Sequence, residues 1–471
     1  SDQIMIKRDQ ISKLNDLDID RIIITNDFGL EADITEFITS LGFYESIFTP
    51  FIVGDMTLQD MQDIMTNLSI VGREKITVSF STPGIDPEIR TVNFRVIGQK
   101  SKIQPNKSRG YILNLRLVSE NYFKNQTSRD SVSIKGKPEV IVQKIKDEYL
   151  SPDTALAVDE TNDEEYSLVF PFQSPLEMIQ KVMVNATPSD STVPEFDAGF
   201  LFYETIDGLN FKCFNNLFKQ APSYVFFNSD TIGADPKTDE FTQGTFITEK
   251  VVFRDSSNRV KQYENGAFSS RTYFHDLTTK QWGARNFSYI NENLVNEKAG
   301  NPNTLNTNLN APLARAIATA QNIDNTMFPV VSPNQVENYS PQKIFFAPRH
   351  TNVQGEDFGT NENNYETLPR VKSNMSLYND TEVEITVSGN SLLRAGQVVT
   401  FMVARNEPVD KIKSSASEFN EEKSGKYVIS SVHHRFFLQD GSYKTYLNLV
   451  RNFRGSIVPS EQNPVNSEEA T

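Results

Sequence analysis

The chain has 471 residues, with 46 Lys and Arg against 61 Asp and Glu and a formal net charge of −15. This balance disfavours a protein that binds nucleic acid through its overall field, because phosphates would be repelled. One Cys excludes an intramolecular disulfide framework, and together with four His it leaves little material for a Cys/His zinc site. Because the sequence has no apolar run of about 18 residues and does not start like a signal peptide, we expect no membrane insertion.

The N-terminal part predicts a polar arm followed by a β-rich module. Residues 1–20 are polar and charged, which is typical of an arm. In the module, residues 21–125, alternating apolar and polar residues predict strands at 22–25, 48–53, 76–80, 91–97 and 111–118. Thr57 and Asp60 form a capping-box pattern, which predicts the start of an amphipathic helix. Its apolar stripe would consist of Leu58, Met61, Ile64, Met65 and Leu68.

The central part, residues 126–240, predicts a mixed α/β connector. One helix is expected at 138–150, opened by Pro. Ser174-Pro-Leu-Glu177 opens a second helix, with Ser as the N-cap and Glu at the third helical position. Two apolar runs in 199–214, joined by Asp207-Gly208, predict a hairpin.

Residues 241–455 predict a second β module that contains a polar insertion. Strand-like alternation resumes at 244–253 and 266–274. Residues from about 290 to 370 are rich in Asn, Thr and Pro, apart from a helical pattern at 311–321. We expect a long loop or insertion there, without a core of its own.

The best-defined stretch is a set of four alternating segments near the C-terminus. They lie at 381–387, 393–403, 426–432 and 443–451, and turn-rich spacers separate them. Asp440-Gly441 predicts a two-residue hairpin turn. This turn would pair Leu438 with Tyr443, Phe436 with Thr445, His434 with Leu447 and Val432 with Leu449. One face of the pair is then mostly apolar, so we expect the strands to close into a small barrel or to pack as a sandwich.

Four stretches, in this order, resemble the baseplate hub proteins of contractile-tailed, T-even-like bacteriophages. The first runs from Gly42-Phe-Tyr-Glu-Ser-Ile-Phe-Thr-Pro50 through Gly54 and Asp60 to Ile70-Val-Gly-Arg-Glu74, similar to that family's ESI…P…G…D…L-I-G-x-E run. The second is 133–138, which leads into a helix. The third is 170–175 with 199–211, similar to the family's F-P…P…A-G…F-Y-E-T-x-D-G-F-x-F pattern. The fourth is the C-terminal set of strands.

The resemblance implies a mainly β fold with some helices (α+β). Two tail-tube-like antiparallel β-barrel domains would occupy 21–125, with one flanking helix, and 241–455, with the polar insertion at about 290–370. The α/β connector 126–240 would join them. The N-terminal arm would precede the first barrel, and residues 456–471 would form a flexible C-terminal tail.

The resemblance also implies a structural virion protein of the tail baseplate, made in the host cytoplasm. Three copies would form a homotrimeric, pseudo-sixfold ring that adapts the sixfold tail tube to the threefold central spike and leaves a channel for DNA. The implied partners are the tail spike protein, the tail tube or tube-initiator protein and baseplate wedge proteins. DNA would pass through the lumen without specific binding, and an acidic lumen would favour this, because Lys and Arg contacts would retain the strand. Acidic loops on the outside would explain the same net charge.

Single residues predict no catalytic, cofactor-binding or metal site. His433 and His434 are neighbours in a strand, so they point to opposite faces and cannot ligate one ion without a bulge. Cys213 lies in an apolar strand pattern, which is typical of a buried, inert thiol. The segment 159–165 predicts a solvated acidic loop, because it lacks the spacing of a calcium-binding loop. Its exposed carboxylates would be Glu160, Asp163, Glu164 and Glu165.

Other polar residues are expected in turns or at the surface. His275 and His350 lack a ligand or a nucleophile at a motif spacing. Segments 388–391 and 394–396 predict turns between strands, and the resemblance allows the second to face a neighbouring subunit. Two interpretations, a subunit interface and a hairpin tip with a packed Tyr, stay open for Tyr203, Glu204 and Asp207-Gly208.

We therefore predict a protein that is not an enzyme. Two alternatives stay open. One is a tail-associated cell-wall hydrolase, against which the lack of a catalytic constellation counts, since any pair chosen from 61 acids is uninformative. The other is a β-rich adhesin, against which the lack of a signal peptide counts.

Overall fold

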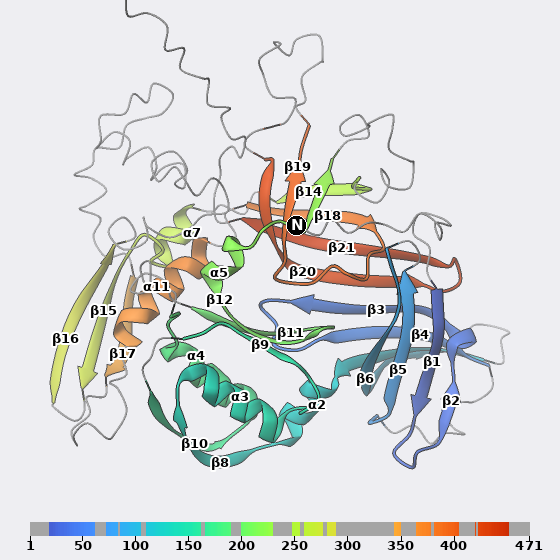
Figure 1. The fold of residues 1–471 in the computed structure, drawn as a ribbon, viewed down its shortest axis with the longest axis horizontal. Coiled ribbons are helices and arrows are strands. Elements are labelled where there is room, and N and C mark those ends of the chain that lie inside the picture. Colours follow the sequence, from blue (N-terminus) through green and yellow to red (C-terminus); the bar gives the residue numbers. More distant parts are fainter. Residues whose placement is uncertain are drawn as a thin grey trace, which may run out of the picture.

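The chain folds mainly into β-strands, with helices at the centre and at one side, and this confirms the expected fold class (Figure 1). The computed structural model describes residues 18–61, 72–82, 85–104, 110–161, 165–189, 199–228, 247–254, 259–276, 280–288, 343–349, 364–377, 381–404, 420 and 423–451. Among these residues the largest unit is a 13-stranded sheet, accompanied by three small sheets.

The first part of the large sheet comes from the N-terminal module. Its elements are β1 (Asp18–Thr25), β2 (Glu31–Asp33), the 3-10 helix η2 (Thr35–Phe37), β3 (Ile38–Ser46), β4 (Val53–Asp60), β5 (Lys75–Thr82), β6 (Asp86–Ile103) and β7 (Tyr111–Ser119). Buried and less buried side chains alternate along these strands, as in β5 with Ile76 and Val78 inside. This period of two is the one that the sequence pattern predicts.

The second part of the large sheet comes from the C-terminal module. Its strands are β13 (Tyr224–Phe227), β14 (Lys250–Arg254), β18 (Thr381–Ser388), β19 (Val398–Met402), β20 (Gly425–Phe437) and β21 (Ser442–Arg451). The two parts join where β20 pairs antiparallel with β3, with His434 opposite Phe43. Phe436 and Tyr443 belong to the same buried core as Phe43, so the two modules share one apolar core at this seam.

In place of the two separate barrels that were expected, strands of both modules form one large sheet. The strand order runs β14-β18-β21-β20-β3-β4-β7-β6-β5-β1-β2, and within the described residues this path does not close into a barrel. The reason is the long strand β20, which pairs with β21 on one side and with both β19 and β3 on the other. Since β3 uses one edge for β20 and the other for β4, it links the two modules into a continuous sheet.

The central module packs below this sheet (Figure 1). Its elements are α2 (Glu120–Thr127), β8 (Asp130–Gly136), α3 (Pro138–Tyr149), β9 (Leu156–Val158), β10 (Tyr166–Gln173), α4 (Pro175–Asn185), β11 (Phe200–Thr205), β12 (Gly208–Cys213) and α5 (Phe214–Lys219). Both expected helices are confirmed, and Ser174 and Glu177 form the predicted capping box at the start of α4. The expected hairpin is confirmed as β11–β12, with Phe202 opposite Phe211.

A small sheet lies at one end of the long axis of the molecule, and we call it the lateral sheet (Figure 1). It consists of β15 (Ser269–Asp276), flanked by β16 (Gln281–Ser288) and β17 (Lys343–Arg349). Two helices accompany it, α7 (Arg259–Glu264) and α11 (Asn364–Leu377). The helix α11 contacts all three strands and also packs on α4, where the Thr367 hydroxyl donates to the Val184 carbonyl at 3.2 Å.

Two predictions for residues 48–60 are wrong. Residues 48–52 form the turn between β3 and β4, and the strand begins at Val53. Thr57 and Asp60, expected to cap a helix, lie inside β4 and pair with β7. Long-range pairing overrides the local capping pattern here, because Leu58 buries its side chain in the core of the sheet. Of the expected helical stripe, Ile64, Met65 and Leu68 lie outside the described residues.

The C-terminal hairpin forms with a register that differs from the expected one by two residues. Phe436 lies opposite Tyr443, and residues 438–441 form a four-residue loop in place of the two-residue turn. In this loop the Gly441 amide donates to the Leu438 carbonyl at 3.4 Å, so Leu438 belongs to the turn and does not pair with Tyr443. An even shift leaves every side chain on its expected face. The four expected pairs, from Leu438–Tyr443 to Val432–Leu449, are therefore wrong, whereas the buried face is correct.

The polar segment at 290–370 contains regular structure. Strand β17 lies inside it and pairs in parallel with β15, and α11 begins at Asn364. Strands β14 and β19 are shorter than the expected 244–253 and 393–403. His275 lies in β15 and not in a turn, with its side chain exposed.

Several further predictions concern residues outside the described part of the chain. These are the arm up to residue 17, the helical pattern at 311–321, His350 and the tail at 456–471. None of the described helices is long and apolar enough to cross a membrane.

Candidate functional site

The hairpin β11–β12 inserts its turn between the N-terminal and C-terminal parts of the large sheet. All six residues of β11 are buried. Gly208 opens β12 with a φ of +141°, and a Cβ there would lie 2.5 Å from the Ala155 carbonyl oxygen, so this close approach requires glycine. We call the polar contacts around this turn the hairpin junction: Glu45, Arg90, Glu204, Asp207 and Arg394. The side chains of Glu45, Glu204 and Arg394 are buried, that of Arg90 is partly buried and that of Asp207 is 57% exposed.

Glu45 of β3 bonds to the hairpin and to the C-terminal module at once. Its Oε1 accepts a hydrogen bond from the Ile206 amide at 2.8 Å, and its Oε2 accepts one from the Ala395 amide at 3.2 Å. The side chain is fully buried. Burial raises the pKa of Glu45 to about 7, against the opposing effects of Arg394 and the two amides. One carboxyl therefore links three segments that are distant in the sequence.

Arg394 is buried and ties the loop 389–397 to the hairpin turn. Its Nε and one terminal nitrogen donate to Asp207 at 2.8 and 3.1 Å, which forms a bidentate ion pair. Asp207 also accepts from Arg90 of β6 at 3.2 Å. Arg90 in turn pairs with Asp86, which accepts from the Ser391 hydroxyl at 3.0 Å. The chain of contacts thus returns to the loop on which Arg394 lies.

Glu204 of β11 makes a second set of buried contacts on the other side of the hairpin. Its Oε2 accepts from the Ile52 amide at 3.1 Å, in the turn between β3 and β4. Its Oε1 accepts from the Asn121 side-chain amide of α2 at 2.6 Å. Burial raises the pKa of this carboxyl, while its hydrogen bonds act in the opposite direction. The hairpin is therefore bound to the N-terminal module by both Glu45 and Glu204.

Tyr203 packs its ring on Gly396, which has a φ of +89°. A Cβ at Gly396 would lie 2.2 Å from the Tyr203 hydroxyl oxygen. The position therefore needs glycine for two reasons, the backbone conformation and the space that the tyrosine fills. Of the two interpretations left open for Tyr203 and Glu204, the structure shows a hairpin packed inside the protein.

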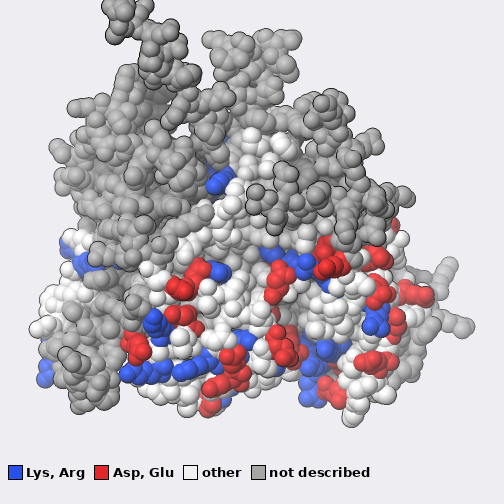
Figure 2. Space-filling view, in the orientation of Figure 1, with Lys and Arg blue, Asp and Glu red and all other residues white. Residues whose placement is uncertain are grey.

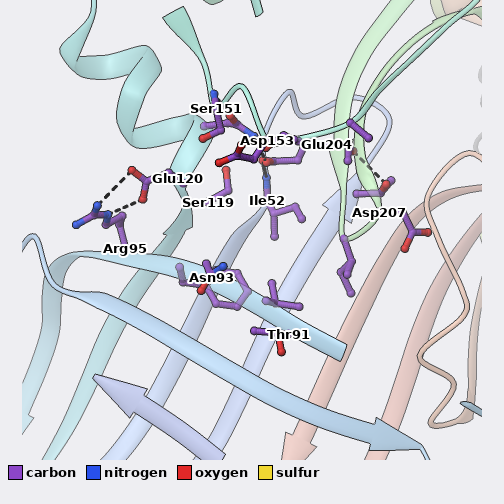
Figure 3. A pocket seen from close by; sticks show the side chains of 18 of the residues that line it. Ile52, Thr91, Asn93, Arg95, Ser119, Glu120, Ser151, Asp153, Glu204 and Asp207 are labelled. Atoms are coloured by element: carbon purple, nitrogen blue, oxygen red, sulfur yellow. Dashed lines mark hydrogen bonds and ion pairs between the residues drawn. The ribbon is translucent and has the colours of Figure 1, made fainter. Parts of the chain in front are cut away.

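A pocket of about 560 Å³ adjoins the hairpin junction (Figure 3). Arg95 and Glu120 form a bidentate ion pair on one wall, at 2.6 and 3.2 Å. Glu204 and Asp207 line the pocket from the hairpin, and Thr91 from β6. Figure 3 shows the ion pair at one side and Asp207 at the other, with Glu204 between them. The charged residues that line the pocket have both signs, so the pocket does not favour a ligand of one charge.

The described part of the chain contains no cluster of three or more His, Cys, Asp or Glu with the geometry of a metal site. His434 is buried, and its Nδ1 lies 2.6 Å from the Tyr443 hydroxyl. His433 stacks on Tyr44 on the opposite face, at 3.8 Å between ring centroids. Burial, with help from Arg435, lowers the pKa of His433 to about 4. Both imidazoles are thus neutral packing elements, on the two faces that the sequence predicts.

Cys213 is buried at the end of β12, as expected. Asp159, expected in a solvated acidic loop, has a different role. It accepts from the Cys213 amide at 2.9 Å and from the side chains of Lys212 and Asn216. Glu165 of the same segment is exposed and pairs with Lys135 at 3.7 Å, whereas Asp163 and Glu164 lie outside the described residues.

The sequence patterns do not indicate that Glu45 and Arg394 belong to one polar junction, although both residues lie in segments that resemble the hub family. A signal for Glu45 exists in β3, since Leu41, Phe43 and Glu45 share the buried face of the strand. An acid at an apolar position of a buried strand needs internal hydrogen-bond donors. Sequence alone could not supply them, because they come from residues 206 and 395.

The chain is a mainly β protein whose modules are held together by polar contacts at the hairpin junction. No protein-family model matches the chain. Over 261 residues the chain is 24% identical to a probable baseplate hub protein of Vibrio phage KVP40. This match covers 53% of the chain and 58% of the relative, so the chain spans a little over half the length of its relative. The expected resemblance to baseplate hub proteins is thereby confirmed.

Solved structures with a similar chain path are also tail proteins. One is a tail protein from Neisseria meningitidis MC58, with a TM-score of 0.47, 11% identity and coverage of 91% of this chain and 96% of that one. Another is a 43 kDa tail protein of prophage MuSo2 from Shewanella oneidensis, with a TM-score of 0.47, 11% identity and coverage of 92% and 98%. At these TM-scores the likeness carries no argument about function.

Proposed function

We propose that this chain is a structural component of a phage tail baseplate, the hub, and that it is not an enzyme. Three copies form a pseudo-sixfold ring that adapts the sixfold tail tube to the threefold central spike. The single observation that carries this proposal is the similarity to a baseplate hub protein over 261 residues.

The hairpin junction supports a role in bearing load. A hub must transmit force between a tube and a spike without deforming, which requires modules that do not move against each other. Here the buried side chains of Glu45 and Arg394, together with the more exposed Asp207, connect the three modules through hydrogen bonds and an ion pair. A buried charged side chain favours one geometry, because displacing its partners leaves it without them.

The partners in this proposal are the spike protein, the tail tube or tube-initiator protein and baseplate wedge proteins. DNA passes through the ring without specific binding. The net charge of −15 supports this part, because an acidic wall repels phosphate. The protein is made in the host cytoplasm and resides in the virion.

Light scattering after size exclusion tests the proposal. The purified chain is measured alone and with the spike protein of the same phage. A mass near three times 53.3 kDa, about 160 kDa, in either sample supports the ring. A mass of 53.3 kDa at high concentration, unchanged by the spike, contradicts it. Incubation with cell-wall substrate tests the non-enzymatic part, for which no release of soluble fragments is expected.

A further inference from the structure

The lateral sheet has one covered face and one bare face. Its inner face packs towards α11, where Phe274 contacts Tyr365 at 4.4 Å between ring centroids. Its outer face carries Tyr273 of β15 with Trp282 and Phe346 of the flanking strands, and their rings lie 6.4 and 5.8 Å from that of Tyr273. Trp282 is 73% exposed and Phe346 is 79% exposed. Large exposed aromatic groups of this kind mark an interaction surface.

The outer face of the lateral sheet carries positive charge and no acid. By the strand registers Arg271 lies on this face, whereas Arg285, Lys343, Arg349 and Asp276 belong to the inner face. Lys280 lies in the turn that joins β15 to β16. The partner of this face should therefore be acidic and should present apolar side chains.

The opposite end of the molecule has this complementary character (Figure 1). Residues 18–37, which include β1 and β2, contain six acids and one base, Arg21. Acidic side chains gather at this end in Figure 2. In the turn between β1 and β2, Phe28 is 84% exposed and Leu30 is 57% exposed. One end thus offers aromatic rings with positive charge, and the other offers apolar side chains with negative charge.

The turn that presents Phe28 is held in a fixed shape. The Asn26 side chain accepts from the amides of Phe28 and Leu30 at 3.0 and 2.9 Å. Gly29 has a φ of +79°, which closes the turn. Arg73 pairs with Asp27 at 3.0 Å beside it. A preformed turn loses little entropy on binding, which is typical of a docking element.

We propose that the outer face of the lateral sheet binds the β1–β2 turn of a second copy of this chain. The contact joins two different surfaces, so it is heterologous, and its repetition closes a ring when the rotation between copies is 120°. This inference rests on the proposed trimeric hub and names the surfaces through which its subunits meet. Phe28 and Leu30 cover the rings of Trp282 and Phe346, and the acids of residues 18–37 face Arg271 and Lys280.

Two double variants, each with one altered surface, test the proposal by light scattering. Trp282→Ser/Phe346→Ser alters the lateral sheet, and Phe28→Ser/Leu30→Ser alters the turn. Val169→Ser/Phe172→Ser is the matched control, since both side chains lie more than half exposed on β10, away from either surface. Measurements use the condition, with or without spike, in which the unmodified chain assembles.

Each altered chain alone should have the monomer mass of 53.3 kDa, and the control should keep the assembled mass. An equimolar mixture of the two altered chains retains one intact pair of surfaces. It should therefore form a heterodimer of twice 53.3 kDa, about 107 kDa, that does not grow further. If either altered chain keeps the trimer mass, or if the mixture stays monomeric, this inference is wrong and the hub proposal stands. A monomeric unmodified chain under every condition contradicts both.

Trp282 supplies a second readout because it is the single Trp of the chain. Assembly should shift its fluorescence emission to shorter wavelength and reduce its quenching by acrylamide. Dilution should reverse both changes in the unmodified chain, and Phe28→Ser/Leu30→Ser should show an exposed Trp282 at all concentrations. A Trp282 that is shielded in the monomer would mean that another part of the same chain covers the face, which overturns the proposal.

Discussion

The hairpin junction and the lateral sheet use charge and aromatic side chains in opposite ways. The junction buries the charged side chains of Glu45 and Arg394 and gives each of them partners inside the protein. The lateral sheet leaves its largest aromatic side chains, Trp282 and Phe346, exposed. The contrast indicates that interior contacts set the shape of this protein, whereas its two ends carry the surfaces that we propose for assembly.

Substitutions should therefore have contrasting effects in the two regions. At the junction they should lower stability, because they leave a buried group unpaired or create overlap. On the lateral sheet they should alter assembly and leave the stability of the single chain almost unchanged. Failure of any one of the following expectations would contradict this contrast between the two regions.

The largest effect is expected for Arg394→Ala. It removes the bidentate partner of Asp207 and the nearest positive charge to the buried Glu45. Asp207 is 57% exposed, so the loss of its ion pair adds little. The main cost comes from the Ser391 and Leu393 carbonyls, which accept from Arg394, because a buried acceptor left without a donor costs about 1–3 kcal/mol. Urea denaturation at neutral pH should show a loss of this size in the free energy of unfolding.

Arg254→Ala is the control for that variant. Arg254 pairs with Glu384 at 2.7 Å, but its side chain is mostly exposed. Exposed pairs contribute about 0–1 kcal/mol, so this loss should be small. Equal losses for Arg254→Ala and Arg394→Ala would contradict a special role of the hairpin junction.

Glu45→Gln should change how stability depends on pH. Burial raises the pKa of Glu45 from 4.5 to about 7, so between these values the folded chain holds a proton that the unfolded chain has lost. The contribution of Glu45 to the free energy of unfolding therefore falls as pH rises through this window. The Gln variant lacks this proton equilibrium.

The measurement is the difference in unfolding free energy between the unmodified chain and Glu45→Gln, followed from about pH 5 to about pH 8. The unmodified chain should lose up to about 3 kcal/mol relative to the variant over this range. His433, with its lowered pKa, has the opposite pH dependence, but it is present in both proteins and cancels in the difference. Two parallel curves would mean that Glu45 is ionised in the fold.

Gly396→Ala should cost about 1–3 kcal/mol, because the new Cβ overlaps the Tyr203 hydroxyl and the backbone has positive φ. Gly72→Ala is the matched control, since its φ is +100° and no atom lies within 4 Å of the added Cβ. Tyr203→Phe should restore part of the loss in Gly396→Ala, which a double-mutant cycle measures. If both glycine variants lose the same stability, the overlap with Tyr203 does not matter.

The smallest effect on stability is expected for Trp282→Ser/Phe346→Ser. Exposed side chains away from a core change the free energy of unfolding by about 0.5 kcal/mol or less. Thermal unfolding of the dilute protein should therefore give a midpoint close to that of the unmodified chain. A loss as large as that of Arg394→Ala would show that the outer face of the lateral sheet is part of the core.

Sequence predicted the fold best where local signals and burial agree. The helices α3 and α4, the hairpin β11–β12 and the buried face of β20 follow from capping residues and periodicity. Prediction from the sequence failed where contacts between residues far apart in the chain determine how the strands pair. The pairing of β20 with β3 joins the two expected modules in one sheet, and the hairpin closes through a four-residue loop at 438–441 where the Asp-Gly pattern predicted a two-residue turn.

The junction could be predicted only in part, for the same reason. The buried position of Glu45 follows from its place beside Phe43 in an alternating strand, whereas its donors lie more than 150 residues away in the sequence. Of the lateral sheet, β15 falls largely within the strand expected at 266–274. Its partner β17 could not be predicted, because it lies in a polar segment with a composition typical of loops.

Electron cryomicroscopy of the assembled protein tests the central claim most directly. We expect a threefold ring with a central channel, in which each copy keeps the hairpin junction intact and Trp282 lies at the boundary with the next copy. A closed dimer, or a threefold assembly without a channel, would contradict the proposed hub.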